Sequence, residues 1–168
     1  MRAPEAAQTR RRDRWLVAFV GVVIAILIGY NLFMFYAPSL LLTGRQVERL
    51  TLFDLESGTE NEVSLPLGSV IVHFWATWCS SCVAEIPLLS SYASRVPIIG
   101  VLKDPIRTDQ LRALDTPWKN YRGLDTTFEK FMITGVPATI FIRDHVVSDI
   151  RMGPLTREVL EKWLAPMR

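Results

Sequence analysis

Cys79 and Cys82 are the two cysteines of this chain, and they lie three positions apart in the segment HFWATWCSSCVAEIP. A disulfide between them closes a loop too short to constrain the unfolded chain strongly, so a stabilising role explains the pair poorly. A zinc site needs further ligands, and only His73, His145 and carboxylates remain. Covalent haem attachment needs a histidine where Val83 stands. The pattern therefore favours reversible thiol chemistry.

The position of the pair between an apolar run and a helical pattern gives each sulfur a role. Cys79 is expected at the N-terminus of a helix, where unpaired amides and the helix dipole favour a thiolate. Cys82 lies one turn inside the helix and is shielded. We predict that Cys79 attacks a disulfide of a partner and that Cys82 resolves the mixed disulfide.

The segments around the pair predict a mixed sheet with helices on both faces. SVIVHFWA, residues 69–76, is a continuous apolar run typical of a central strand, and a helix is expected from about residue 79 or 80 to 93. A hairpin at residues 47–67 precedes them. Further elements are expected as strands at 96–104 and 117–123, helices at 106–115 and 126–133, a strand pair at 138–152 and a final helix at 155–167.

The N-terminal part of the chain predicts a membrane anchor. No charged residue occurs between Arg14 and Arg45, and residues 15–36 are almost all apolar, enough for a helix that crosses a bilayer. No A-x-A-like site follows this run, and the residues before Ala37 are the bulky Met34, Phe35 and Tyr36, which favours a retained anchor over a cleaved signal. Residues 1–14 carry a formal charge of +3 and are expected to remain in the cytoplasm.

The rest of the chain is then exported, to a compartment where disulfides persist. It holds 14 basic and 15 acidic residues, so it lacks the basic excess of a nucleic-acid-binding protein. We predict a cytoplasmic tail at residues 1–14, a transmembrane anchor at 15–36, a tether at 37–44 and an extracytoplasmic domain at 45–168. This places the chain in the bacterial inner membrane, with its C-terminal domain in the periplasm.

The motif VIVHFWATWCSSC, followed much later by GVPATIFI, resembles thioredoxin-fold proteins, in which W-C-x-x-C faces a cis-proline loop. The N-terminal anchor, the early hairpin, Glu85 after the motif and the helix and strand inserted before GVP are similar to the TlpA/ResA/CcmG (DsbE) group of membrane-anchored thiol-disulfide oxidoreductases. The resemblance covers about residues 45–165 and implies an α/β thioredoxin-like fold after one transmembrane helix.

The resemblance also implies roles for single residues. Cys79 and Cys82 match the redox-active disulfide, and Pro137 matches the cis-proline, which would set the Val136 backbone to pair with an extended partner. Without the resemblance, Pro137 reads as an ordinary trans proline opening an edge strand. Trp78 matches a substrate-contact position.

Two further residues are candidates for proton transfer. Glu85 follows Cys82 by three residues, and it is either a poorly solvated acid and base for the Cys82 thiol or a solvated helix glutamate. His73 departs from the aspartate or asparagine of the relatives and is either a proton relay or a hydrogen-bonded strand residue. Ser80 and Ser81 replace the prolines often found between the cysteines.

The implied function is reduction of protein disulfides, with apocytochrome c as a candidate substrate and a DsbD- or CcdA-like membrane protein as electron donor. No cofactor or metal is expected. Two alternatives stay open. One is a copper-binding or metal-delivery module that uses Cys79, Cys82 and His73, since soft thiolates suit Cu(I). The other is a protein that protects thiols under copper stress.

Overall fold

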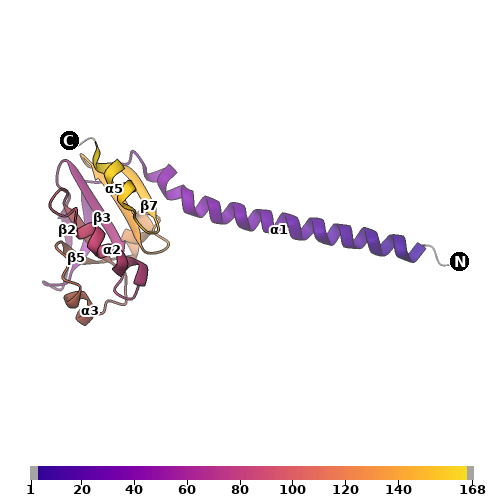
Figure 1. Ribbon diagram of the computed structural model, residues 1–168, viewed down its shortest axis with the longest axis horizontal. Helices are drawn as coiled ribbons and strands as arrows, with labels where there is room; N and C mark the ends of the chain where they lie inside the picture. The colour runs from indigo at the N-terminus through magenta and orange to yellow at the C-terminus, as the bar shows by residue number, and fades with distance from the viewer. Residues whose placement is uncertain (1–3, 166–168) are drawn as a thin grey trace. The chain divides into compact units, whose positions relative to one another are not determined.

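The computed structural model describes residues 4–165 and divides the chain into two compact units, one ending at Ala37 and the other beginning at Pro38. Helix α1, Pro4–Leu42, makes up the first unit and enters the second (Figure 1). Its segment Trp15–Phe33 has a mean hydropathy of 2.5 and none of it is buried. In residues 4–165 this is the one helix long and apolar enough to cross a membrane.

The predicted tether is partly helical. Residues 38–42 continue α1 through Pro38, and the chain leaves the helix only at Thr43 and Gly44. Three leucines in a row favour helix here, and Leu42 is buried in the core beside Val47.

The second unit is built on one seven-stranded sheet with the strand order β2-β1-β5-β4-β3-β6-β7. The strands are β1 Arg49–Asp54, β2 Thr59–Ser64, β3 Ser69–Trp75, β4 Ile98–Leu102, β5 Lys119–Gly123, β6 Ala138–Arg143 and β7 Val146–Met152. Strand β3 runs parallel to β4 and antiparallel to β6. The predicted early hairpin, central strand and late strand pair are all present, which confirms the mixed sheet.

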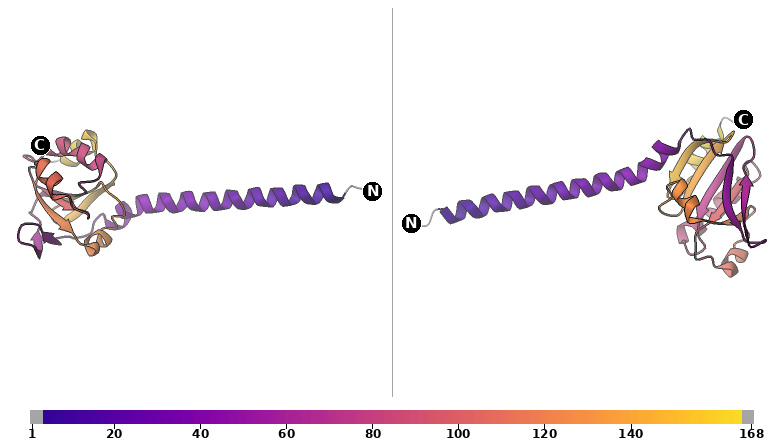
Figure 2. Two further views of the ribbon diagram at one scale, coloured as in Figure 1. Left: turned by 90° about the horizontal axis from the view of Figure 1, so that it is seen from below. Right: turned by 180° about the vertical axis from the view of Figure 1, so that it is seen from behind.

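Helices cover both faces of this sheet (Figure 2). They are α2 Ser80–Ser90, α3 Thr108–Ala113, α4 Asp125–Lys130 and α5 Arg157–Leu164. Alternate residues of β3 enter two separate cores, because successive side chains of a strand point to opposite faces. Phe74 packs with Phe128 of α4, whereas Trp75 lies in the core that contains Leu89 of α2 and Trp163 of α5. All seven residues of β3 are buried, as predicted.

Helices α2, α3 and α4 end earlier than the sequence indicates. Helix α2 stops at Ser90, where the Ser91 hydroxyl donates to the Leu88 carbonyl at 2.7 Å and so satisfies an end carbonyl. Helix α4 stops before Met132, whose φ of 53° lies in the left-handed region. The final helix begins as predicted, with the Thr156 hydroxyl accepting from the Val159 amide.

The turn between β6 and β7 contains no glycine, yet it requires left-handed backbone at two residues. Asp144 has a φ of 48° and His145 a φ of 65°. Both side chains bind the loop before β3: Asp144 Oδ1 accepts from the Gly68 amide at 3.0 Å, and His145 Nε2 lies 3.0 Å from the Leu65 carbonyl. These contacts stabilise the turn without glycine.

Gly100 in β4 gives a test of this packing. A Cβ there would lie 2.0 Å from Asn120 Oδ1 and 3.0 Å from Trp118 Nε1. The Asn120 amide cannot swing away freely, because its Oδ1 accepts from Trp75 Nε1 at 3.1 Å. We expect Gly100→Ala to lower the free energy of unfolding by about 1–3 kcal/mol, measured by urea denaturation of the full-length protein in detergent. Gly135→Ala is the control, because open space surrounds that position, and equal effects of the two substitutions would contradict this account.

Candidate functional site

Cys79 and Cys82 form a disulfide where β3 gives way to α2, with their Cα atoms 5.2 Å apart. Cys79 is the N-cap of α2, in extended backbone conformation, and its sulfur accepts from the Cys82 amide at 3.2 Å. Its relative exposure is 8%, whereas that of Cys82 is 0%. Cys79 is therefore the less buried of the two cysteines, the order that the predicted roles require.

The loop before β6 faces this disulfide. The Val136–Pro137 peptide bond is cis, as the resemblance implies. The Val136 carbonyl oxygen lies 3.8 Å from the Cys79 sulfur, which is a contact and not a hydrogen bond, because a disulfide sulfur carries no hydrogen. This brings together two predicted site residues that are 57 positions apart.

The two tryptophans near the cysteines occupy different environments. Trp78, directly before Cys79, is 47% exposed, so its ring is open to a partner. Trp75 is fully buried and donates from Nε1 to Asn120 Oδ1 at 3.1 Å. Trp75 is thus a core residue, whereas Trp78 has the exposure that its predicted role in substrate contact requires.

A serine hydroxyl also reaches the first sulfur, which sequence reasoning missed. Ser81 Oγ lies 3.3 Å from Cys79 Sγ. The sulfur in the disulfide can only accept, so the Ser81 hydroxyl is the donor. The signal for this contact was the polar residue inside the C-x-x-C motif, two positions after a helix N-cap.

Glu85 is buried on α2, one turn after Cys82. The backbone amide of Leu155, in the loop before α5, donates to Glu85 Oε1. Burial raises the pKa of this carboxyl from 4.5 to about 7, and the Leu155 hydrogen bond opposes that shift only in part. Of the two predicted environments, the poorly solvated one is present.

His73 lies in β3 on the sheet face that α2 covers, and its side chain is fully buried. Its Nδ1 is 3.0 Å from Thr139 Oγ1, and its Nε2 is 3.8 Å from Glu85 Oε2. Burial lowers the pKa of the imidazole to about 3, so the ring is neutral at physiological pH. Thr139 is the contact that a hydrogen-bonded strand histidine requires, and Glu85 is the nearby carboxyl that a proton relay would require.

The described side chains form no cluster of metal ligands. In residues 15–33 and 36–165, whose side chains the structure describes, no group of three or more His, Cys, Asp or Glu side chains is placed to hold a metal ion. The copper hypothesis needs Cys79, Cys82 and His73 together, and these residues do not form such a group in the disulfide-bonded protein.

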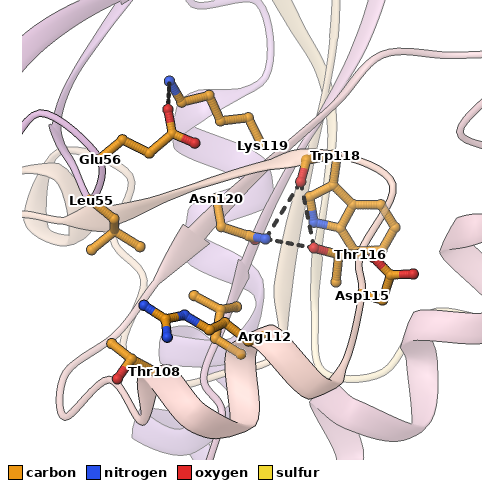
Figure 3. A pocket seen from close by; sticks show the side chains of 10 residues that line it. Leu55, Glu56, Thr108, Arg112, Asp115, Thr116, Trp118, Lys119 and Asn120 are labelled. Carbon is orange, nitrogen blue, oxygen red and sulfur yellow. Dashed lines mark hydrogen bonds and ion pairs between the residues drawn. The ribbon is translucent and has the colours of Figure 1, made fainter.

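A hollow of about 390 Å³ lies between α3 and the start of β5 (Figure 3). Lys119 on its wall reaches Glu56 at 3.5 Å and Asp54 at 2.8 Å. Trp118 Nε1 is buried near Gly100, so it is not available to a molecule in the hollow. No predicted site residue lines it, so the disulfide site is a separate feature.

Comparison with known proteins agrees with this geometry. The chain is 26% identical to the thiol-disulfide oxidoreductase ResA of Halalkalibacterium halodurans, over 92% of this chain and 95% of the relative. It is 28% identical to the thiol:disulfide interchange protein DsbE of Xylella fastidiosa (strain 9a5c), over 58% of this chain and 53% of the relative. No protein-family model matches the chain.

The fold is that of solved thioredoxin-like structures. A thioredoxin-family thiol:disulfide interchange protein from Chlorobium tepidum superimposes with a TM-score of 0.61 and 21% identity, over 73% of this chain and 95% of that one. The predicted thioredoxin-like fold is therefore confirmed.

The contact between Ser81 and the first sulfur predicts an effect on its acidity. In the reduced protein, the hydroxyl would stabilise a Cys79 thiolate. We expect Ser81→Ala to raise the pKa of the Cys79 thiol by about 0.5–1 unit, because a hydrogen bond to a charged group contributes about 1 kcal/mol or more. Ultraviolet absorbance of the thiolate against pH measures this value. Ser80→Ala is the matched control, and a shift of equal size in both variants would contradict the assignment.

The raised pKa of Glu85 predicts how stability depends on pH. Between pH 4.5 and about 7 the folded protein keeps a proton that the unfolded chain has released, so stability falls as the pH rises through this window. Gln at position 85 cannot ionise. We expect Glu85→Gln to be more stable than the wild type by up to about 3 kcal/mol at about pH 8, and the difference to shrink toward pH 4.5.

Urea denaturation of the full-length protein across this pH range checks the prediction. Glu158→Gln is the control, since Glu158 is exposed on α5. If the free energy of unfolding of the wild type and of Glu85→Gln changed in parallel with pH, the pKa of Glu85 would not be raised by folding.

Proposed function

We propose that this thioredoxin-fold chain, a thiol-disulfide oxidoreductase similar to ResA and DsbE, reduces disulfides of extracytoplasmic proteins while anchored to the bacterial inner membrane. The observation that carries the proposal is the sulfur of Cys79 at the N-cap of α2, facing the cis-Pro137 loop. A helix N-terminus stabilises the thiolate, and the thiolate is the form that attacks disulfides.

The reaction follows from the positions of the two sulfurs. The Cys79 thiolate attacks one sulfur of a substrate disulfide, forming a mixed disulfide and releasing the other sulfur as a thiolate. The Cys82 thiol then loses its proton, and its sulfur attacks Cys79. This step forms the observed Cys79–Cys82 disulfide and releases the second substrate thiolate. The substrate gains two electrons, which the protein loses.

The surface around Cys79 suits an extended protein substrate. Trp78 exposes an apolar face beside the sulfur, and the Val136 backbone lies next to it. A substrate segment that pairs with this backbone places its disulfide against Cys79, a form of strand addition. We therefore assign substrate binding to Trp78, Val136 and Pro137, and acid-base chemistry on Cys82 to Glu85.

A reductant in an oxidising compartment must be reduced again after each turnover. We propose that a DsbD- or CcdA-like membrane protein supplies the two electrons through its own dithiol. The N-terminal tail, with its charge of +3, favours a cytoplasmic N-terminus and a periplasmic C-terminal domain. DsbE among the relatives makes apocytochrome c the candidate substrate.

Trapping with Cys82→Ala tests the proposal. Without the second sulfur, the mixed disulfide between Cys79 and its partner cannot resolve, so we expect covalent adducts in cells that produce the full-length variant. Adducts are detected by non-reducing electrophoresis, released by a thiol reductant and identified by mass spectrometry. Apocytochrome c or a haem-handling protein among them supports the substrate assignment, and a membrane dithiol protein supports the donor.

The double variant Cys79→Ala/Cys82→Ala is the matched control and should yield no adducts. Adducts with cytoplasmic proteins alone would reverse the proposed topology. Stoichiometric, tight Cu(I) binding by the reduced protein without any trapped partner would favour the copper hypothesis instead.

A further inference from the structure

Two buried polar atoms without hydrogen-bond partners face each other behind the disulfide. Among the side chains that the structure describes, in residues 15–33 and 36–165, His73 Nε2, Glu85 Oε2 and Trp118 Nε1 are the buried nitrogen and oxygen atoms that lack a partner. The first two lie 3.8 Å apart. Leaving such atoms unpaired in a core is costly, so two of them at one place indicate a function.

The opposite side of the His73 ring is held by a rigid contact. Thr139 lies directly across from His73 in the β3–β6 ladder, and both side chains are fully buried. Thr139 Oγ1 is 3.0 Å from His73 Nδ1. When the hydroxyl donates to Nδ1, the single hydrogen of the neutral ring must be on Nε2, and it then points toward Glu85.

We propose that His73 and Glu85 form a pair that holds one proton, in which Thr139 fixes the His73 hydrogen on Nε2 and this N–H stabilises the Glu85 carboxylate. His73 and Thr139 are positioning residues that act through Glu85. A side-chain shift of less than 1 Å brings the 3.8 Å separation to hydrogen-bond distance when Glu85 ionises. The raised pKa of Glu85 and the lowered pKa of His73 agree with a neutral ring beside a carboxyl that titrates near neutral pH.

Few other groups act on the pair. The Leu155 amide donates to the second Glu85 oxygen, and the Trp75 ring stacks beside the His73 ring with centroids 6.5 Å apart. Cys82 lies one turn earlier on α2. Among the described residues, no other acidic or basic side chain forms an ion pair with either member. We assign the proton exchange of the pair to the Cys82 thiol, because Cys82 lies one turn before Glu85 on the same helix.

The use of this pair rests on the proposed function. During substrate reduction, the Cys82 thiol transfers its proton to the Glu85 carboxylate, and the resulting thiolate attacks Cys79. The pair then carries one proton more, with its His73 N–H unchanged. When a donor reduces the Cys79–Cys82 disulfide, Glu85 returns the proton to the Cys82 thiolate. The neutral His73 ring stabilises the anionic state of Glu85 without itself becoming charged.

Carboxyl-carbon NMR of Glu85 in the oxidised full-length protein tests the inference without any substrate. We expect Glu85 to titrate near pH 7 in the wild type. Thr139→Val lets the ring hydrogen move to Nδ1, and His73→Phe removes the donor, so both should raise the pKa of Glu85 by about one unit, which lowers the ratio of carboxylate to carboxylic acid at pH 7 about tenfold. Thr139→Ser keeps the hydroxyl and should preserve the wild-type titration.

Thr127→Val is the matched control. The buried Thr127 hydroxyl, in α4, donates to the Thr51 carbonyl in β1, and neither residue contacts His73 or Glu85 in these hydrogen bonds. Nitrogen NMR of the His73 ring gives a second readout. We expect a neutral ring with its hydrogen on Nε2 between about pH 5 and 9. A hydrogen on Nδ1, an imidazolium near neutral pH, or a Glu85 titration unchanged in Thr139→Val and His73→Phe would overturn the inference.

The two proposals fail separately. Disulfide adducts with Cys82→Ala, together with an unchanged Glu85 titration in the variants, would overturn the proton pair alone. A shifted titration without adducts would leave the pair intact and overturn protein disulfide reduction.

Discussion

A sulfur atom is the first hydrogen-bond acceptor of helix α2, and the rest of the site depends on that contact. Cys79 can cap the helix only because β3 ends four residues earlier and the chain enters α2 in extended conformation. All seven residues of β3 are buried, which holds the end of the strand in the core. The donor that caps the helix in the disulfide form is then in place to stabilise the thiolate in the reduced form.

The features predicted correctly from the sequence are those with local causes. A continuous apolar run specified β3, and three-residue spacing placed Cys82 inside the helix that Cys79 caps. The cis bond at Pro137 followed from family resemblance, because no local pattern distinguishes cis from trans proline. Contacts between distant segments were beyond prediction: the Leu155 amide reaches Glu85 across 70 positions, and Thr139 reaches His73 across 66.

The core behind the disulfide contributes less to stability than an entirely apolar core would. Most of its buried side chains are apolar, yet an ionisable carboxyl and an imidazole lie among them with one polar atom each unpaired. Apolar residues of similar volume at these positions would remove that cost. The protein is thus destabilised at the place where a thiol must gain and lose protons, a trade-off between stability and activity that is common at functional sites.

The two outer strands of the sheet are protected against pairing with other chains. Strand β2 presents Glu60 and Glu62 to solvent, and the start of β7 is hydrogen-bonded to residues 44–47 just after α1. Charged or covered edges resist pairing with other chains. Pairing between copies of the protein through these two edge strands is therefore disfavoured.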